Sequence, residues 1–333
     1  MKVLIPLAGF GTRLRPLTYT RPKPLLNVAG KPVLGHILDS LEGLDVEEVT
    51  FIIGYLGDQI REYVAESYHF PARFVEQKEL LGQAHALWLA RDGIDGPVLI
   101  IFVDTIFKAD LGGIAGVAAD GIIYVKEVDD PRRFGVVKVT GPDATIIRLI
   151  EKPAGFEDRL AVSGIYYIKD GAWLMRAVDT LMGQQRMTQG EYYLADALQV
   201  MIEQGAHFVA REVEVWEDCG KPETVLATNR YLLDHGHDNS GTAPPGSSAI
   251  VKPVHLGAGV VLEEAVVGPY ATLGDGAVVR RSVVRNSIVG KQALVEDSLL
   301  TGSLIGDYAV VRGLPIKLNI GDSSQVDIVP AGE

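Results

Sequence analysis

The chain has 333 residues, of which 47% are hydrophobic and 22% charged, and its formal net charge at pH 7 is −12. This length predicts about two domains, and the negative charge argues against nucleic-acid and membrane partners, because both surfaces would repel the chain. We find no signal peptide and no run of about 18 apolar residues that could span a bilayer, so we expect a cytoplasmic protein. The single cysteine, Cys219, excludes an internal disulfide and a multi-cysteine metal site.

Residues 1–235 alternate short apolar runs with longer amphipathic patterns. We predict strands at 2–7, 48–54, 72–77, 97–103, 121–128, 135–140, 146–152 and 161–168. We predict helices at 31–44, 58–68, 83–94, 171–182, 192–205 and 221–236. This alternation is typical of an α/β domain with a Rossmann-like, mainly parallel sheet that helices cover on both faces.

The composition changes after residue 235. Residues 236–249 are rich in Gly, Pro and Ser and are predicted to be a linker. Within residues 250–333, aliphatic residues recur mostly in steps of six, at Val267, Leu273, Val279, Val289, Val295, Ile305 and Val311. Such a hexapeptide repeat predicts a C-terminal left-handed parallel β-helix, in which each coil stacks one aliphatic residue per face. The alternative is a β-sandwich, but alternating strands have no reason to keep a six-residue phase.

Behind the first predicted strand, residues 7–26 read LAGFGTRLRPLTYTRPKPLL. A Walker loop would need Gly-Lys-Ser/Thr, and a dinucleotide fingerprint would need a third glycine where the chain has Leu14. The small residues at 8–12 let backbone N–H groups approach an anion, and Arg13, Arg15 and Lys23 add positive charge. We therefore predict a triphosphate site here; the alternative is a surface turn with solvated cations.

This stretch resembles the signature of the sugar-1-phosphate nucleotidyltransferases, also called nucleotide-sugar pyrophosphorylases. Further motifs follow in the family's order: EQKELLGQAHAL (76–87), VDTIF (103–107), DDPRRFGVV (129–137), EKP (151–153), VSGIYYI (162–168), GEYYLADAL (190–198) and WEDCG (216–220). The resemblance covers nearly the whole chain. It is closest to the glucose-1-phosphate thymidylyltransferases and uridylyltransferases, in particular to the long forms that carry a β-helix.

The resemblance implies an enzyme in which a sugar-1-phosphate oxygen attacks the α-phosphorus of a nucleoside triphosphate and pyrophosphate is released. Because the nucleophile is already an anion, the site mainly has to position its substrates and neutralise negative charge. The resemblance implies that Arg13 serves the β- and γ-phosphates and that Lys23 lies near the α-phosphate. The loop residues expected around the nucleotide are Ala8, Gly9, Gly11, Thr12 and Arg13.

Two aspartates are the expected ligands of Mg²⁺. Asp104 ends an apolar run and Asp218 follows another, so both carboxylates are predicted at strand ends, where ligands commonly bind. Mg²⁺ takes a few carboxylates together with phosphate oxygens and waters, and the resemblance points to the same pair. A helix or turn cap is the alternative for Asp104, and Glu217 is the nearest competitor of Asp218.

For the sugar phosphate, the resemblance implies that Glu151 accepts a hydrogen bond from a sugar hydroxyl and that Lys152 binds the phosphate as a catalytic residue. Gly135 and Gly164 would let the sugar approach the backbone closely. Without the resemblance, Glu151 and Lys152 would be interpreted as an exposed charged pair at a strand end. Glu191 is a weaker candidate, since it could equally be a charge that the dipole favours at a helix start.

For the base, the candidates are Gln77 and Gly82. A glutamine amide offers a donor and an acceptor to the imide edge of uracil or thymine, which makes dTTP or UTP with glucose-1-phosphate the first choice. The alternative is GTP with mannose-1-phosphate, because the loop also resembles that of mannose-1-phosphate guanylyltransferases.

Two departures from the family pattern concern residues beside the aspartates. Val103 stands where glycine is usual, and Cys219 replaces the usual threonine. A catalytically weak regulatory or scaffold relative is therefore the rival hypothesis, but the chain keeps both aspartates and both main cations, which favours catalysis. We expect the β-helix to mediate homo-oligomerisation.

Overall fold

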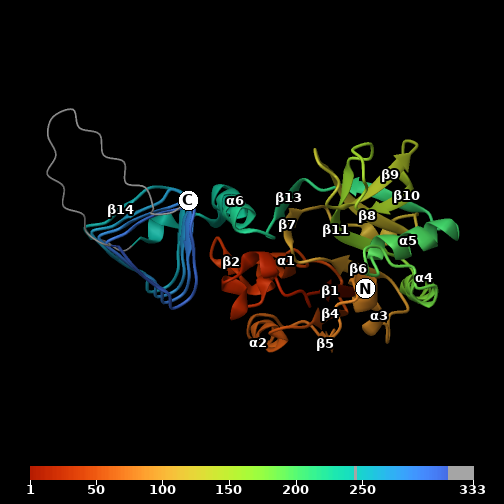
Figure 1. Ribbon diagram of the computed structural model, residues 1–333, viewed down its shortest axis with the longest axis horizontal. Helices are drawn as coiled ribbons and strands as arrows, with labels where there is room; N and C mark the ends of the chain where they lie inside the picture. Colours follow the sequence, from red (N-terminus) through yellow and green to blue (C-terminus); the bar gives the residue numbers. More distant parts are fainter. Residues whose placement is uncertain (244–245, 314–333) are drawn as a thin grey trace. The chain divides into compact units, whose positions relative to one another are not determined.

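The computed structural model describes residues 1–243 and 246–313. The chain divides into two compact units, Met1–Asp238 and a second unit that begins at Asn239. Figure 1 shows an α/β unit and a stack of short strands. Residues 314–333 of the predicted β-helix domain lie outside the described residues. No described helix is long and apolar enough to cross a membrane.

A nine-stranded sheet forms the centre of the first unit. Its strands, in spatial order, are β5 (Ala72–Glu76), β4 (Glu48–Ile53), β1 (Lys2–Pro6), β6 (Val98–Ile101), β11 (Leu160–Ile168), β8 (Gly121–Glu127), β12 (Phe208–Glu212), β10 (Thr145–Glu151) and β9 (Gly135–Thr140). The α/β fold class is confirmed. Pairing is parallel from β5 to β6 and between β8 and β12. β11 is antiparallel to β6 and β8, and β9 and β10 are antiparallel because residues 141–144 join them by a tight turn.

Six α-helices accompany this sheet: α1 (Val33–Asp39), α2 (Gly57–Ser67), α3 (Gln83–Leu89), α4 (Gly171–Gly183), α5 (Leu194–Glu203) and α6 (Pro222–Leu232). Apolar side chains of α3, α4 and α5 share one buried cluster with the central strands. The side chain of Asp170 begins α4 by accepting a hydrogen bond of 2.7 Å from the N–H of Trp173. The helix predicted at 83–94 ends at Leu89, because the chain turns there and Ile94 donates to the carbonyl of Arg91.

A two-stranded ribbon pairs β7 (Thr105–Lys108) with β13 (Val215–Asp218) in antiparallel register, with Thr105 opposite Asp218. The strands β7 and β12 were not predicted, because their short runs lack a clear hydrophobic period. The ribbon brings together two chain segments that are more than a hundred residues apart.

The second unit is a parallel β-helix with three sheets, as predicted. The first contains β14 (Ala249–Ile250), β17 (Val266–Val267), β20 (Val283–Arg285) and β23 (Leu299–Thr301). The second contains β15 (Val254–Leu256), β18 (Ala271–Leu273), β21 (Ser287–Val289) and β24 (Leu304–Ile305). The third contains β16 (Val261–Glu263), β19 (Val278–Arg280), β22 (Leu294–Glu296) and β25 (Val310–Arg312).

The aliphatic residues of the hexapeptide repeat point inward and stack coil upon coil. Leu273 pairs with Val289, and Val279 pairs with Val295, in adjacent parallel strands. These four side chains are buried in a single cluster inside the coils. The repeat therefore supplies the hydrophobic core of this unit.

The boundary between the units falls after Asp238, inside the segment 236–249 that was predicted to be a linker. Part of this segment is ordered structure, since Ser240–Thr242 form a short 3-10 helix and Ala249–Ile250 form β14. The side chain of Asn239 holds the first coil by donating to the carbonyl of Leu256 at 2.8 Å and accepting from its N–H at 2.7 Å.

Candidate active site

The glycine-rich loop follows β1 and is held in a defined shape by its own side chains. Gly11 has a φ of 61°, and a Cβ at this position would lie 3.0 Å from Cβ of Lys23. The hydroxyl of Thr18 donates to the carbonyl of Gly11 at 2.9 Å. Gly9 is different, because a Cβ there would meet no atom within 4 Å. Gly11 is thus required by the fold, whereas the space beside Gly9 is open to a ligand.

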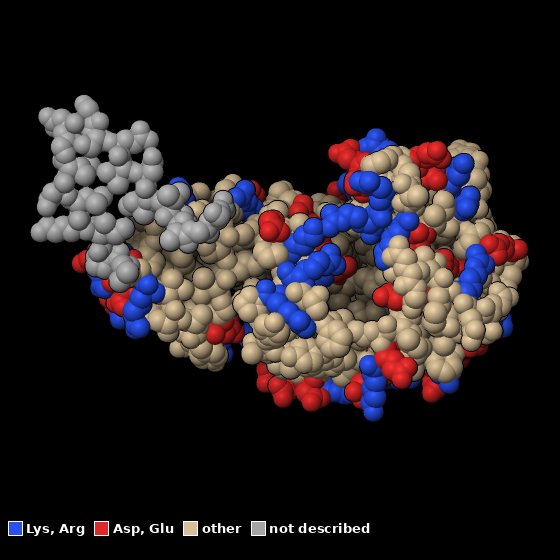
Figure 2. Space-filling model, viewed as in Figure 1, with Lys and Arg blue, Asp and Glu red and all other residues tan. Residues whose placement is uncertain are grey.

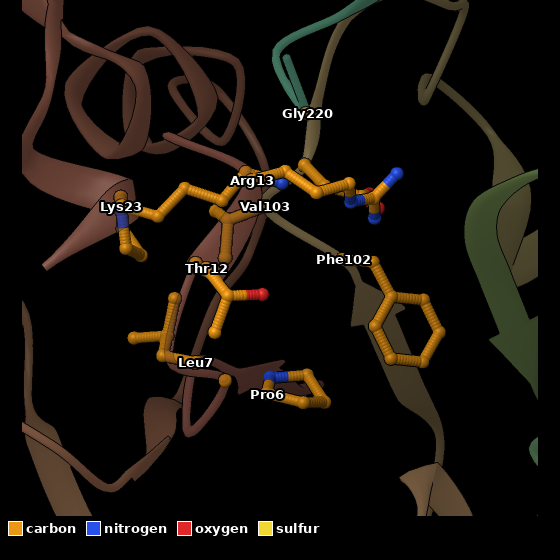
Figure 3. A pocket seen from close by; sticks show the side chains of 12 residues that line it. Pro6, Leu7, Thr12, Arg13, Lys23, Phe102, Val103 and Gly220 are labelled. Carbon is orange, nitrogen blue, oxygen red and sulfur yellow. The ribbon is translucent and has the colours of Figure 1, made fainter. Parts of the chain in front are cut away.

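A pocket of about 260 Å³ opens beside this loop. It is lined by Pro6, Leu7, Gly9, Gly11, Thr12, Arg13, Lys23, Pro24, Phe102, Val103, Asp104 and Gly220. Figure 3 shows these side chains around the pocket. Figure 2 shows a hollow on this face of the first unit, with Lys and Arg side chains gathered beside it. Most of the residues predicted to hold the triphosphate therefore meet at one pocket.

The three cations of the loop region occupy different positions. Arg13, in a 3-10 helix (Thr12–Leu14), and Lys23, in another (Lys23–Leu25), both line the pocket. Arg15 stacks over the ring of Tyr19, with 4.9 Å between its guanidinium carbon and the ring centroid. Arg15 is absent from the described pocket lining, so this cation has a local packing role.

The two predicted metal ligands are brought side by side by the β7–β13 ribbon. Asp104 directly precedes β7, and Asp218 is the last residue of β13. The N–H of Cys219 donates to the carbonyl of Asp104 at 2.7 Å, which ties the two strand ends together. Asp218 Oδ1 accepts from the N–H of Gly220 at 2.8 Å, and both carboxylates belong to exposed residues.

These two carboxylates fit a hard divalent cation. Carboxylate oxygens are ligands that Mg²⁺ prefers, and two of them beside a phosphate pocket leave the other coordination positions to substrate oxygens and water. Among the described residues, no three His, Cys, Asp or Glu side chains come together as a ready-made metal site. Asp104 and Asp218 therefore suit a metal that arrives with a phosphate substrate.

Cys219 follows Asp218 in the chain, contacts Asp104 through its backbone and is only 1% exposed. Burial raises the pKa of its thiol to about 12, partly opposed by a hydrogen bond with Thr228 and by the charge of Lys23. The thiol thus stays protonated at neutral pH, and its small side chain fills space behind the carboxylates.

A second group of predicted residues gathers where β9 and β10 pair. Gly135 is paired directly with Glu151, and a Cβ on Gly135 would lie 2.9 Å from Glu151 Oε2. Burial raises the pKa of Glu151 to about 7; Lys152 opposes this rise, while Asp196 and Glu191 add to it. Glu151 is therefore a half-buried carboxyl with a perturbed pKa, and not a solvated strand-end charge.

Lys152 adopts a φ of 46°, which is unusual for a residue with a side chain. Its Nζ donates to the hydroxyl of Tyr193 and, at 3.4 Å, to Oε1 of Gln189. Burial lowers the pKa of Lys152, but the Tyr193 hydroxyl and the neighbouring carboxylates outweigh this effect and raise it. The strained backbone and the two side-chain contacts hold the ammonium group in one place.

Gly164 joins the two groups. It has a φ of 87°, and a Cβ on it would lie 3.2 Å from Cβ of Phe102, a residue of the pocket lining. Phe102 also packs edge-on against Tyr166, with ring centroids 5.9 Å apart. Burial and the charges of Glu151 and Asp104 all raise the pKa of Tyr166. The pocket residues and the group around Glu151 are therefore both close to strand β11, which carries Gly164 and Tyr166.

Gln77 is 6% exposed and uses its amide nitrogen twice. Nε2 donates to the carbonyl of Gly82 at 3.2 Å and lies 3.2 Å from Nδ1 of His85. Burial lowers the pKa of His85, so its ring is neutral at pH 7 and Nδ1 can accept this bond. Gly82 has a φ of 105° and packs against the backbone of Tyr192, where no side chain would fit.

The structure thus brings together Gly9, Gly11, Thr12, Arg13, Lys23 and Asp104 at one pocket, with Asp218 held beside its Gly220 wall. Ala8 is buried against Gly54 and, like Gln77 and Gly82, is absent from the described pocket lining.

Two residues of this region were not predicted. Phe102 precedes the VDTIF motif, and its apolar type was assigned to the strand core. Tyr193 lies in the GEYYLADAL motif, where only Glu191 was chosen; its contact with Lys152 depends on the tertiary structure.

Comparisons with known proteins identify relatives of this chain. A family model described as nucleotidyl transferase matches residues 2–235. The chain is 32% identical over 272 residues to a bifunctional protein GlmU of Methanococcus vannielii, across 80% of this chain but only 62% of that protein. It is 29% identical over 359 residues to a glucose-1-phosphate thymidylyltransferase of Streptomyces griseus, across 98% of this chain and 99% of that protein.

Among solved structures, a UDP-glucose pyrophosphorylase in complex with UDP-glucose has a TM-score of 0.63 and 20% identity, and the match covers 70% of this chain and 98% of that one. This last likeness concerns the fold alone.

Proposed function

Because the chain belongs to the nucleotidyl transferase family, we propose that it transfers a nucleotidyl group from dTTP or UTP to a hexose-1-phosphate in a Mg²⁺-dependent reaction. Glucose-1-phosphate is the proposed acceptor, and the products are a nucleotide sugar and pyrophosphate. The thymidylyltransferase relative, whose full length the chain matches, supports this choice.

In the proposed reaction, a phosphate oxygen of the sugar-1-phosphate forms a bond to the α-phosphorus of the triphosphate. The bond from the α-phosphorus to the oxygen that bridges to the β-phosphorus breaks, and the electron pair leaves with pyrophosphate. No proton has to be removed from the nucleophile, since a phosphate oxygen is already anionic at neutral pH. The protein therefore has to align two anions and stabilise the departing one.

The glycine-rich loop and its two cations suit the triphosphate. The open space at Gly9 lets backbone N–H groups approach phosphate oxygens. Arg13 offers a planar guanidinium to the departing pyrophosphate, and Lys23 offers a point charge from the neighbouring turn. Together they oppose the repulsion between the two anionic substrates.

Asp104 and Asp218 would hold the metal ion. When bound, Mg²⁺ neutralises phosphate charge and orients the phosphate oxygens for in-line displacement. The hydrogen bond between Cys219 and Asp104 fixes the separation of the two strand ends that carry the carboxylates. Asp218 also keeps one oxygen on the Gly220 N–H, which restricts how its carboxylate can turn.

The group around Glu151 suits the sugar phosphate. Glu151 would accept hydrogen bonds from sugar hydroxyls, and Lys152 would bind the phosphate that attacks. A Cβ at Gly135 would displace the carboxylate of Glu151, because it would lie 2.9 Å from Oε2. Gly164 would leave similar room on the other side, beside Phe102.

The base assignment depends on Gln77. Since its Nε2 already donates to Gly82 and His85, the group left for the base is Oε1, a hydrogen-bond acceptor. The N3–H of uracil or thymine would donate to it. The N1–H of guanine could donate to the same atom, so a GTP-dependent mannose-1-phosphate guanylyltransferase is the second candidate.

One observation carries the proposal: Asp104 lines the pocket with Arg13 and Lys23, and the backbone bond from Cys219 to Asp104 brings the distant segment of Asp218 beside it. The test is pyrophosphate release from dTTP, UTP, GTP, CTP and ATP with glucose-, mannose-, galactose- and N-acetylglucosamine-1-phosphate, with and without Mg²⁺. Turnover with dTTP or UTP supports the proposal, and turnover with GTP alone transfers it to the second candidate. Nucleotide binding without any turnover would identify a regulatory relative instead.

A further inference from the structure

The third sheet of the β-helix exposes a regular outer face. In each of its strands the middle residue points into the coil, and the two flanking residues point outward. The inward residues are Leu262, Val279, Val295 and Val311. The outward residues form two parallel columns that run across β16, β19, β22 and β25.

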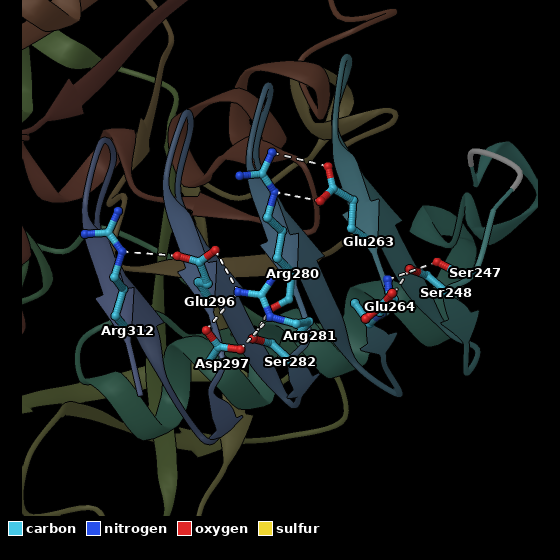
Figure 4. A network of polar contacts seen from close by, with 11 residues as sticks. Ser247, Ser248, Glu263, Glu264, Arg280, Arg281, Ser282, Glu296, Asp297 and Arg312 are labelled. Atoms are coloured by element: carbon cyan, nitrogen blue, oxygen red, sulfur yellow. Dashed lines mark hydrogen bonds and ion pairs between the residues drawn. The ribbon is translucent and has the colours of Figure 1, made fainter. Parts of the chain in front are cut away.

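The first column consists of charged residues that alternate in sign. In order along the β-helix they are Glu263, Arg280, Glu296 and Arg312. Arg280 lies 2.9 Å from Glu263, and Arg312 lies 3.2 Å from Glu296. Figure 4 shows this ladder with Arg281, which joins Glu296 to Asp297 at 2.9 and 2.7 Å.

The second column is apolar throughout. Its residues, in the same order, are Val261, Val278, Leu294 and Val310. Val261 is 39% exposed and Val310 is 57% exposed, while Val278 and Leu294 are half-buried. A row of four aliphatic side chains beside a row of charges is typical of an interaction surface, because a partner can bury the aliphatic groups while the charges fix its register.

We propose that this face binds the same face of a second copy of the chain, with the two β-helices antiparallel. A two-fold axis that runs along the strands reverses the order of the rungs and leaves each column opposite itself. Glu263 then faces Arg312 of the second copy, and Arg280 faces its Glu296. The apolar columns meet as well, with Val261 opposite Val310 and Val278 opposite Leu294.

This arrangement is self-complementary because the column has four members of alternating sign. Reversal of such a series places every acidic residue opposite a basic one. An axis along the β-helix would instead place the charged column against the apolar column, which would desolvate charges without partners. A parallel arrangement of copies is therefore disfavoured on this face.

The ladder is not sufficiently explained by the stability of a single copy. Ion pairs between exposed side chains contribute little to folding, and three of these side chains are at least 39% exposed, while Glu296 is 20% exposed. Between two copies, the same charges would select one register and one direction. Four strands at a spacing of about 4.8 Å make a small interface, so we expect a weak dimer that depends on concentration.

Cross-linking tests the direction. We expect a mixture of Val261→Cys and Val310→Cys full-length chains to form a disulfide-linked heterodimer under mild oxidation, because these positions face each other. Val261→Cys alone should form none, since its own copies lie three strand spacings apart, about 14 Å, and a disulfide needs Cα atoms within about 7 Å. The native Cys219 is buried and should not interfere. Self-linking of Val261→Cys would contradict the antiparallel arrangement and overturn the proposal.

A charge exchange tests the pairing. We expect Glu263→Arg, or Arg312→Glu, to raise the dimer dissociation constant about tenfold or more in sedimentation equilibrium, because each places like charges opposite one another. The double variant should restore association, although within one copy it places like charges on neighbouring strands. If the ladder only stabilised the single copy, the double variant would be the least stable of the three variants and its dimerisation would not be restored.

Leu294→Asp should also abolish the dimer. Leu299→Asp, on the first sheet, is the matched control and should leave it intact, although Leu299 is 68% exposed. A chain that remains monomeric at every concentration, or one whose self-association ignores Glu263→Arg and Leu294→Asp, would overturn the proposal. A monomer that Leu294→Asp destabilises would indicate that another segment of the chain covers the face, and would overturn it too. None of these outcomes depends on enzymatic turnover.

Discussion

The backbone N–H of Cys219 donates to the carbonyl of Asp104 across 2.7 Å. This hydrogen bond joins the start of β7 to the end of β13, two strands that are more than a hundred residues apart in the sequence. Asp104 lines the pocket together with Arg13 and Lys23, and Asp218 accepts a hydrogen bond from Gly220, which also lines it.

Replacement of either aspartate should remove activity but not the fold. We expect Asp104→Asn and Asp218→Asn each to lower kcat about 100-fold or more, because the metal would lose a charged ligand. A Mg²⁺ titration of pyrophosphate release should show a raised requirement for the metal. Glu217→Gln is the matched control, since it removes a carboxylate one residue away, and it should keep most of the activity. Equal losses in all three variants would contradict the assignment.

The two loop arginines should behave differently. Arg13→Ala is expected to lower kcat about 100-fold, because the pocket loses the guanidinium that would stabilise pyrophosphate. Arg15→Ala should change kcat less than about threefold, since Arg15 stacks on Tyr19 away from the pocket lining. Steady-state kinetics of both variants decide the point, and a larger loss for Arg15→Ala would reverse the roles.

The two glycines of the loop separate folding from binding. Gly11→Ala should destabilise the protein by about 1–3 kcal/mol, because of its positive φ and its contact with Lys23. Gly9→Ala should leave the melting temperature nearly unchanged, since its surroundings are open.

Gly9→Ala should nevertheless raise the KM for the triphosphate about tenfold, if backbone N–H groups at this position approach the phosphates. Thermal unfolding and kinetics on the same samples make the comparison. A Gly9→Ala variant with an unchanged KM would place the triphosphate elsewhere.

Glu151 should make stability depend on pH. Burial raises its pKa to about 7. An unfolded glutamate ionises near pH 4.3, so between about pH 4.3 and 7 the folded state holds a proton that the unfolded state has lost, and the free energy of unfolding falls as the pH rises. Glu151→Gln removes this penalty. We expect the variant to exceed the parent protein in stability by up to about 3 kcal/mol at pH 8 and to match it near pH 4.

The same variant should lose activity, because the carboxylate that accepts sugar hydroxyls is gone. In the parent protein, kcat/KM for the sugar phosphate should rise with pH through about 7 as Glu151 ionises. Chemical denaturation and pH–rate profiles of both proteins measure the two effects. A stability difference that does not change with pH would show that Glu151 has an ordinary pKa.

Gln77 should contribute to nucleotide binding through Oε1, the atom left for the base. Gln77→Leu removes the acceptor that would face the base, and we expect kcat/KM for dTTP and UTP to fall about 10- to 100-fold. His85→Ala should lower kcat/KM less, since His85 only orients the Gln77 amide through its contact with Nε2. The measurement is kcat/KM of each variant for each nucleotide, and values that do not change in Gln77→Leu would exclude Gln77 from base recognition.

The sequence by itself determined the architecture. Strand and helix periods separate so clearly in residues 1–235 that most elements were placed within a few residues, and the hexapeptide phase could only be satisfied by stacked coils. Glycines, cations and prolines within twenty positions also located the phosphate loop, because their chemistry is local. These features can be predicted from the sequence because each depends on residues that are close together in the chain.

Only the tertiary structure decided how distant residues meet. The β7–β13 ribbon, which joins Asp104 to Asp218, depends on hydrogen bonds between segments more than a hundred residues apart. The raised pKa of Glu151 depends on burial, and the contact of Lys152 with Tyr193 depends on the packing of β10 near α5. The ion pair between Glu263 and Arg280 depends on the stacking of neighbouring coils. The sequence repeat predicts that coils stack, but not which charged side chains then come into contact. Desolvation and long-range contact are properties of the folded chain, and no local period encodes them.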